Sequence, residues 1–378
     1  MSAGRPVYLD YNATAPLRPE AAEAMQHALS QPANPSSVHQ FGRAARALMD
    51  QARLHIATAL QVKPVDLTFT SGGTEANNMV LAGFKTVIAS SVEHDAVLAA
   101  CPTAQLIAVD SQGVVSLSHL EQMLTGLSDA HRPETVVSVM AANNETGVIQ
   151  PIDEAAKICQ TFGIPLHVDA TQTIGKLPLN PLVSGISAVT FTAHKFHGPT
   201  GVGALWLAPQ LKIHPVFHGG EQQLETRPGT EPVALVVAMS EALKLAVDEM
   251  ESSAEHCRRL RDRLEQGLIN QHPDLVIQGK THDRLPGTSS ISFLKTDRQS
   301  MLMALDMAGI ACSSGPACSS GSSPPSHVLI AMGRSNEEVE STLRFGVSKF
   351  STMEEIDRAI VRISNVYSRL RHNKNVDN

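Results

Sequence analysis

Between residues 64 and 207 the chain alternates short β-rich runs with helical patterns, and this alternation limits the possible folds more than any other feature. The runs are rich in β-branched and aliphatic residues, which is typical of buried strands. They are LTFT, TVIAS, QLIAV, TVVSVM, IPLHV, AVTFT and GALWL. Strands that alternate with helices form a mostly parallel sheet with helices on both faces. We therefore predict an α/β fold built on such a sheet.

A change of pattern after about residue 232 predicts a second, smaller α/β domain. Two long helical segments come first, and then two β-rich runs and a helix that opens with the capping box Thr352–Glu355. A chain of 378 residues is also long for a single core. We expect a large domain over residues 16–250 and a small domain formed by residues 1–15 and 251–378.

Charge and cysteine content argue against several classes of protein. The net charge of -7 disfavours a surface for nucleic acid or anionic membranes. No apolar run approaches the roughly 18 residues of a membrane helix, and the N-terminal segment lacks the apolar core of a signal peptide. Five cysteines without paired spacing predict neither a disulfide framework nor a zinc site. We expect a cytoplasmic protein without a structural metal.

Polar residues follow the predicted strands at their carboxyl ends, where ligands bind on a parallel sheet. After LTFT, two glycines and Thr74 open a helix whose amides could bind an anion, although a simple helix cap is the alternative. His94 follows the next strand and could stack on a planar cofactor or be structural. Asn143, Asn144 and Glu145 end another strand, where asparagine also commonly forms turns.

Two charged residues at strand ends give the sharpest signal. Asp169 ends the run LHVD, and a buried carboxylate there needs a partner such as a protonated pyridine nitrogen; Gln172 lies three residues on. Lys195 ends the run TAHK, where burial would make it a nucleophilic amine able to form a Schiff base. A lysine at the surface with its stem on the protein is the alternative. An anion site, a stacking ring, an acid and an amine together predict a pyridoxal phosphate site.

The run SSGPACSSGSSPPS, over residues 313–326, places Cys318 among serines, glycines and prolines. Such a run packs poorly, so we expect a mobile segment that carries a thiol. Pro316 fixes its own φ and restricts the residue before it, which should stiffen the approach to Cys318. Cys312 follows an apolar run, and we expect it to be packed.

Eight motifs, in order, resemble the NifS/IscS-type cysteine desulfurases, which are fold-type I pyridoxal-phosphate enzymes. The motifs are YLDYNATAP, NPSSVHQFGR, FTSGGTEANN, HVDATQTIGK, TAHKFHGPTGVGALW, RPGTEPV, SSGPACSSG and LRFGVSKFST. The similarity runs from about Tyr8 to Asp357. The sequence around Cys318 resembles the class with the longer catalytic-cysteine loop, except that Pro316 stands where that class usually has serine.

The resemblance implies roles for individual residues. Lys195 would be the Schiff-base lysine and would shuttle the substrate Cα proton. His94 would stack on the ring and, as a catalytic residue, take protons from the substrate, and Asp169 would pair with the pyridine nitrogen. Arg344 would grip the substrate carboxylate, and Asn12 would lie close to the substrate. The other implied cofactor contacts are Thr74, Asn144, Gln172, Thr192, His194 and, reaching the cofactor of the partner subunit, Thr230.

The resemblance also implies an activity. It predicts a homodimer that converts L-cysteine to L-alanine and leaves the sulfur on Cys318 as a persulfide for an acceptor protein. The acceptor could be an iron–sulfur scaffold, a tRNA-thiolation carrier, a DNA-phosphorothioation system or a molybdenum-cofactor pathway. One alternative is another fold-type I enzyme, such as a selenocysteine lyase or an aminotransferase. The other is a non-catalytic, desulfurase-like scaffold subunit, which the presence of every catalytic residue type disfavours.

Overall fold

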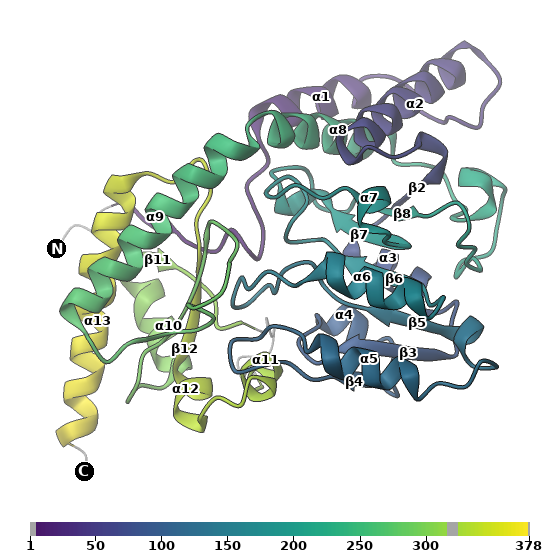
Figure 1. The fold of residues 1–378 in the computed structure, drawn as a ribbon. Coiled ribbons are helices and arrows are strands. Elements are labelled where there is room, and N and C mark those ends of the chain that lie inside the picture. The colour runs from purple at the N-terminus through teal and green to yellow at the C-terminus, as the bar shows by residue number, and fades with distance from the viewer. Residues whose placement is uncertain (1–4, 316–323, 377–378) are drawn as a thin grey trace.

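The computed structural model of the chain describes residues 5–315 and 324–376, and a seven-stranded sheet forms the centre of its larger part (Figure 1). The strand order is β2-β8-β7-β6-β5-β3-β4. Strand β8 runs antiparallel to both of its neighbours, and the other paired strands are parallel. The strands are β2 (Leu67–Thr70), β3 (Thr86–Ser90), β4 (Gln105–Ile107), β5 (Thr135–Ser138), β6 (Leu166–Asp169), β7 (Ala188–Thr192) and β8 (Gly203–Leu207). The predicted mostly parallel sheet is confirmed.

Neighbouring residues of the inner strands contact different helices, because side chains along a strand point alternately to the two faces of a sheet. Ala188 of β7 and Leu205 of β8 pack against α3 (Gly73–Leu81), whereas Val189 and Trp206 join the largest hydrophobic cluster. Five helices contribute to that cluster: α1 (Pro19–Leu29), α2 (Gln40–Leu60), α5 (Leu117–Thr125), α6 (Ile152–Thr161) and α8 (Val233–Asp248). Short helical turns connect these elements: η1 (Pro64–Asp66), α4 (Asp95–Leu98), η2 (Arg132–Glu134), α7 (Pro181–Ser184), η3 (Ala193–Lys195) and η4 (Gln222–Glu225).

A second hydrophobic core joins Val7 and Leu9 to residues from the last third of the chain. A three-stranded antiparallel sheet of order β12-β10-β9 and the parallel pair β1–β11 belong to this part. Figure 1 shows α9 and α13 side by side, away from the seven-stranded sheet. The elements are β1 (Val7–Tyr8), α9 (Met250–Gln271), β9 (Val276–Ile277), β10 (Thr288–Ser292), α10 (Arg298–Met307), β11 (Ile310–Ala311), α11 (His327–Ala331), α12 (Asn336–Ser341), β12 (Thr342–Gly346) and α13 (Met353–Val376).

The capping box predicted at the start of α13 is present. The Glu355 amide donates to Thr352 Oγ1 at 3.2 Å, and the Thr352 amide donates to the Glu355 carboxylate at 2.9 Å. No helix within the described residues is long and apolar enough to cross a membrane. The predicted domain boundaries at residues 15 and 250 stay a prediction.

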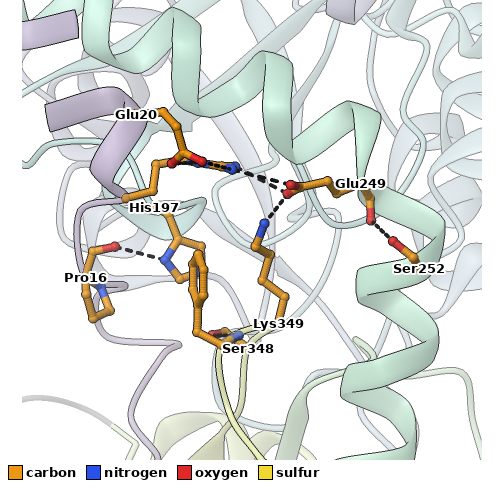
Figure 2. A network of polar contacts seen from close by, with 9 residues as sticks. Pro16, Glu20, His197, Glu249, Ser252, Ser348 and Lys349 are labelled. Atoms are coloured by element: carbon orange, nitrogen blue, oxygen red, sulfur yellow. Dashed lines mark hydrogen bonds and ion pairs between the residues drawn. The ribbon is translucent and has the colours of Figure 1, made fainter. Parts of the chain in front are cut away.

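Glu249 links three segments at the junction of the two parts (Figure 2). It lies between α8 and α9, and its carboxylate pairs with Lys349, which follows β12, and with Arg18, which precedes α1, at 3.4 Å. Arg18 is only 3% exposed and also pairs with Glu20 at 3.1 Å. A buried guanidinium needs an opposite charge nearby. Glu249 supplies it, and its ion pairs connect the α8–α9 junction to the segment before α1 and to the segment after β12.

Candidate active site

A cavity of about 400 Å³ is lined by residues from both parts of the molecule. Ten of the site residues predicted from the sequence line this one cavity, although they are spread from residue 12 to residue 344. They are Asn12, Thr74, His94, Asn144, Asp169, Gln172, Thr192, His194, Lys195 and Arg344. The large sheet brings eight of them together because its parallel strands end on the same edge, whereas Asn12 and Arg344 come from the second part of the molecule.

Lys195 ends the helical turn η3, which follows β7 directly. Its Nζ donates hydrogen bonds of 2.7 Å to the backbone carbonyls of Asn12 and Ala13. Burial, and then the positive charges of Arg344 and Lys176, lower the pKa of Lys195 to about 7. A lysine with this pKa has a large uncharged, nucleophilic share at neutral pH, and the two carbonyl contacts of its Nζ disfavour a solvated surface lysine.

Asp169 ends β6 and is 7% exposed. Its carboxylate accepts hydrogen bonds from Asn77 Nδ2 at 2.7 Å and from the Thr171 amide at 2.9 Å. Glu93, which the sequence did not single out, is fully buried near it and accepts a hydrogen bond from the Met140 amide. Burial, reinforced by the negative charge of Asp169, raises the pKa of Glu93 well above its ordinary value. Of the two carboxyl groups, Asp169 and not Glu93 is therefore suited to pair with a cationic ring nitrogen.

Helix α3 begins at Gly73 in the wall of the cavity. The first amides of an α-helix have no acceptor within the helix, so they attract anions. Thr171 Oγ1 is buried beside Gly73 and has no hydrogen-bond partner among the described residues. Thr74 and Thr192 line the same cavity, and the Thr192 hydroxyl donates to the Val202 carbonyl at 3.0 Å. This end of the cavity is suited to a phosphate group.

Two histidines of the cavity are held by their Nδ1 atoms. His94 caps α4, and its Nδ1 accepts a hydrogen bond from the Ala96 amide at 3.0 Å, which leaves the proton of the neutral ring on Nε2. His194 Nδ1 lies 3.1 Å from Thr14 Oγ1. Burial, and then the charge of Lys195, lower the pKa of His194 to about 4, so this ring is uncharged near neutral pH.

The two asparagines after β5 have different functions. Asn143 Oδ1 accepts hydrogen bonds of 2.9 Å from the amides of Glu145 and Thr146, so this residue forms a turn. Asn144 lines the cavity, and its backbone carbonyl accepts a hydrogen bond from Arg344 at 2.9 Å. The turn alternative therefore holds for Asn143, whereas Asn144 is part of the site.

Arg344 of β12 is 5% exposed, and its guanidinium pairs with Asp10 at 3.0 Å. Its Nε has no partner among the described residues. Asp10 was not predicted as a site residue, although a buried arginine needs a carboxylate and Asp10 belongs to the same motif as Asn12. The Asn12 side chain itself donates to Thr288 Oγ1 at 2.8 Å.

Two predicted site residues are not among those that line the cavity in the described part of the chain. Thr230 is exposed and lies apart from the cavity wall, and Cys318 lies outside the described residues, as does Pro316. Gly315, the last described residue before them, lines the cavity. Cys312 packs against the second core, and burial raises its pKa, which fits the packed role predicted for it.

The cavity offers groups that suit pyridoxal phosphate. Lys195 supplies an amine of low pKa for the aldehyde, Asp169 supplies a carboxylate for the ring nitrogen, and the α3 amides with Thr171 supply donors for the phosphate. Within residues 5–315 and 324–376, no group of three or more His, Cys, Asp or Glu side chains could hold a metal ion.

Comparisons with known proteins agree with this fit. Residues 7–359 match the aminotransferase class-V family. The chain is 39% identical over 384 residues to cysteine desulfurase IscS of Dictyoglomus turgidum, which covers 97% of this chain and 96% of that protein. It is 37% identical over 390 residues to the IscS-like cysteine desulfurase of Mycobacterium tuberculosis, with 96% and 97% covered. The solved structure of a NifS-like protein from Rickettsia africae superposes with a TM-score of 0.90 at 32% identity, over 96% of this chain and 100% of that one.

Proposed function

The chain belongs to the aminotransferase class-V family, and we propose that it is a pyridoxal-phosphate-dependent cysteine desulfurase of the fold-type I class. The observation that carries the proposal is the position of Lys195, an amine of lowered pKa in one cavity with Asp169 and Arg344. The full-length similarity to proteins named cysteine desulfurase supports the same activity.

Pyridoxal phosphate would be held by residues that line the cavity. Lys195 would bind its aldehyde, Asp169 its ring nitrogen, and the start of α3 its phosphate. The remaining proposed contacts are Thr74, His94, Asn144, Gln172, Thr192 and His194. When bound, this cofactor supplies an electron sink for a carbanion at the substrate Cα.

The side chains of the cavity would bind L-cysteine and move its proton. The unpaired Nε of Arg344, with the neighbouring nitrogen, would hold the substrate carboxylate in a two-point contact, and Asn12 would lie beside the substrate. Lys195 Nζ, once uncharged, would take the Cα proton, because a general base works best with a pKa near the working pH. Asp169 would keep the ring nitrogen protonated.

Cys318 would receive the sulfur. Its thiolate would attack the substrate sulfur, so that a sulfur–sulfur bond forms while the substrate carbon–sulfur bond breaks. L-cysteine and the Cys318 thiol then become L-alanine and a Cys318 persulfide, with all atoms accounted for. The persulfide sulfur would pass to an acceptor protein, for which an iron–sulfur scaffold is one candidate.

We propose a homodimer in which Thr230 reaches the cofactor phosphate of the partner subunit. The exposure of Thr230, apart from the cavity of its own chain, supports this assignment. We also propose that residues 16–250 form the large domain and residues 1–15 with 251–378 the small one, as the two hydrophobic cores suggest. The sparse, unpaired cysteines favour a cytoplasmic location.

Sulfide release from L-cysteine with a thiol reductant tests the activity, and the cofactor absorbance tests binding. We expect yellow protein, loss of sulfide release in Cys318→Ser, and loss of the absorbance in Lys195→Ala. The matched control is Cys101→Ser, since Cys101 is half-buried beside other hydrophobic residues and lies outside the cavity. Full sulfide release by Cys318→Ser would refute the assigned nucleophile, and normal turnover by Lys195→Ala would refute the whole proposal.

The same assays separate the alternatives. A selenocysteine lyase would prefer L-selenocysteine to L-cysteine, an aminotransferase would release no sulfide, and a non-catalytic scaffold would show neither cofactor absorbance nor sulfide. Capture of proteins by the persulfide form, followed by their identification, would name the sulfur acceptor.

A further inference from the structure

Lys176 lies in a second, smaller cavity next to the reaction cavity. This second cavity, of about 80 Å³, is lined by residues of α8, α9 and the segment after β12. Asn12 and Lys195 line both cavities, whereas Lys176 lines only the second. Lys176 is therefore close to the proposed reactive lysine without facing the space where the substrate would lie.

The turn before Lys176 is fixed by a glycine. Gly175 has a φ of 76°, which favours glycine, and a side chain there would come within 3.0 Å of the Cβ atoms of both Ala246 and Phe196. The Lys176 amide donates to the Thr173 carbonyl at 2.9 Å. The turn packs closely on Ala246 of α8 and on Phe196, and this packing fixes the backbone position of Lys176.

A chain of hydrogen bonds runs from Lys176 to Lys195. Lys176 Nζ donates to Gln172 Oε1 at 3.3 Å, and Gln172 Nε2 donates to the Asn12 carbonyl at 3.1 Å. The same carbonyl accepts a hydrogen bond from Lys195 Nζ at 2.7 Å. A lysine only donates and a carbonyl only accepts, so these two neighbours fix which end of the Gln172 amide is oxygen and which is nitrogen.

The amide orientation matters because Gln172 also lines the reaction cavity. Gln172 Nε2 donates one of its hydrogens to the Asn12 carbonyl, and the second is available to donate to an oxygen of a bound cofactor. Without Lys176, the Gln172 oxygen would lose its donor, and the amide would lose one of the two contacts that orient it. The sequence did not single out Lys176, although it belongs to the motif that contains Gln172.

Lys176 also contributes a positive charge to the site. Burial lowers its own pKa to about 8, so most of it is still protonated at neutral pH, and its charge helps to lower the pKa of Lys195. Glu249 also lines this cavity but already pairs with Arg18 and Lys349. Other titratable or charged groups line this cavity or interact with Lys176 through their charge: Tyr11, Arg18, His194, Lys195, His197, Glu249, Cys257, Arg344 and Lys349.

We propose that Lys176 is a positioning residue for the cofactor site, which orients the Gln172 amide toward the cofactor and holds a positive charge beside Lys195. The inference rests on the proposed function, because that function assigns Lys195 and Gln172 to the cofactor. Lys176 would act through these two residues and would touch neither substrate nor cofactor.

Three substitutions separate the two effects. Lys176→Met keeps the aliphatic stem but removes both the donor and the charge; Lys176→Gln keeps a donor without charge; Lys176→Arg keeps both. In the cofactor-free protein, the pH midpoint for modification of Lys195 by acetic anhydride, read by mass spectrometry, reports the charge effect. In the cofactor-loaded protein, cofactor affinity and the pH midpoint of the cofactor absorbance report the orientation and the charge together.

We expect Lys176→Met to raise both midpoints by on the order of half a pH unit and to weaken cofactor binding by about tenfold, the loss typical of one neutral hydrogen bond. Lys176→Gln should raise the midpoints but keep near-native affinity, and Lys176→Arg should match the native protein in all three. If Lys176→Met only lowers the thermal stability and leaves midpoints and affinity unchanged, Lys176 is merely structural and the inference is wrong. Lys195→Ala, assayed in parallel, distinguishes this failure from that of the proposed function, which fails if that variant keeps the cofactor and turns over normally.

Discussion

Gly203→Ala should both destabilise the protein and damage the phosphate end of the site. Gly203 opens β8 between β2 and β7, with Thr70 and Thr192 as its register partners. A Cβ at this position would lie 2.7 Å from the Phe191 carbonyl oxygen and 2.8 Å from the Gly72 Cα. Carbon contacts settle at about 3.5–4.0 Å, so backbone on both sides would have to withdraw by several tenths of an ångström.

The expected cost follows from what would have to move. Both obstructing groups are backbone, which cannot rotate away as a flexible side chain can, so we expect a loss of about 1–3 kcal/mol in the free energy of unfolding. Gly72 directly precedes α3, whose first amides would hold the cofactor phosphate. A displacement that removes about 1.4 kcal/mol from that contact would weaken cofactor binding about tenfold.

Urea denaturation of the cofactor-free protein measures the first effect, and titration of the cofactor absorbance measures the second. Gly126→Ala is the matched control, because Gly126 is exposed after α5, has a φ of -74° and has no atom nearer than 3.5 Å to an added Cβ. The control should be neutral or more stable by up to about 1 kcal/mol. A Gly203→Ala protein as stable as the control, with native cofactor affinity, would refute the steric reasoning.

Three further substitutions test other parts of the structure by urea denaturation. The pKa of Lys195 falls from 10.5 to about 7 on folding. At a pH between these two pKa values, Lys195 is therefore protonated in the unfolded chain and mostly deprotonated in the folded protein. The stability of the cofactor-free protein should therefore rise with pH across that window, and Lys195→Met should flatten the rise; an identical slope in both would contradict the lowered pKa. Arg284→Met should cost about 3–5 kcal/mol, because it leaves the buried Glu265, now paired at 2.7 Å, without its charged partner and with only the Ser289 hydroxyl as a donor. The exposed ion pair of Arg263 is the control, and Arg263→Met should cost under about 1 kcal/mol; equal losses would refute the burial argument. Thr352→Ala removes the hydroxyl that accepts the amide of the third residue of α13 and should cost about 1 kcal/mol, and an unchanged midpoint would show that this cap is not needed.

The strands of the large sheet could be predicted because both of its faces are covered. A strand buried on both faces appears as a short, nearly continuous apolar run, and each of the seven runs forms a strand. The edge strand β4 is the exception to this burial, since Gln105 and Leu106 are exposed. The direction of β8 is less evident, since strand direction is not a property of composition. The segment between Thr192 and Gly203 has no helical pattern, however, and such a short link favours an antiparallel neighbour.

Most of the site could be predicted because its side chains follow strands that end at one edge of the sheet. The residues that the sequence did not single out are those whose function depends on one particular neighbour in the folded chain. Asp10 matters because Arg344 lies beside it, Glu93 because Asp169 is near, and Lys176 because Gln172 faces it. Burial and pairing of this kind arise only when the chain folds. Even Lys176 and Gln172, which are four residues apart, meet only through the turn between them.

The N-terminal segment has a consequence for the order of events during synthesis. The carbonyls of Asn12 and Ala13 hold the Lys195 amine, yet β1, which leads into them, pairs with β11, and Asp10 bridges Gly346. A ribosome will have released all seven strands of the large sheet long before Gly346 emerges, and domains generally fold as they appear. Until then the segment that carries these two acceptors is held only by its contacts with the large part, such as the Ala15 amide on the His194 carbonyl, and lacks those with β11 and Gly346. The cavity wall, which includes Arg344 of β12, should accordingly be complete only after the two chain ends have come together.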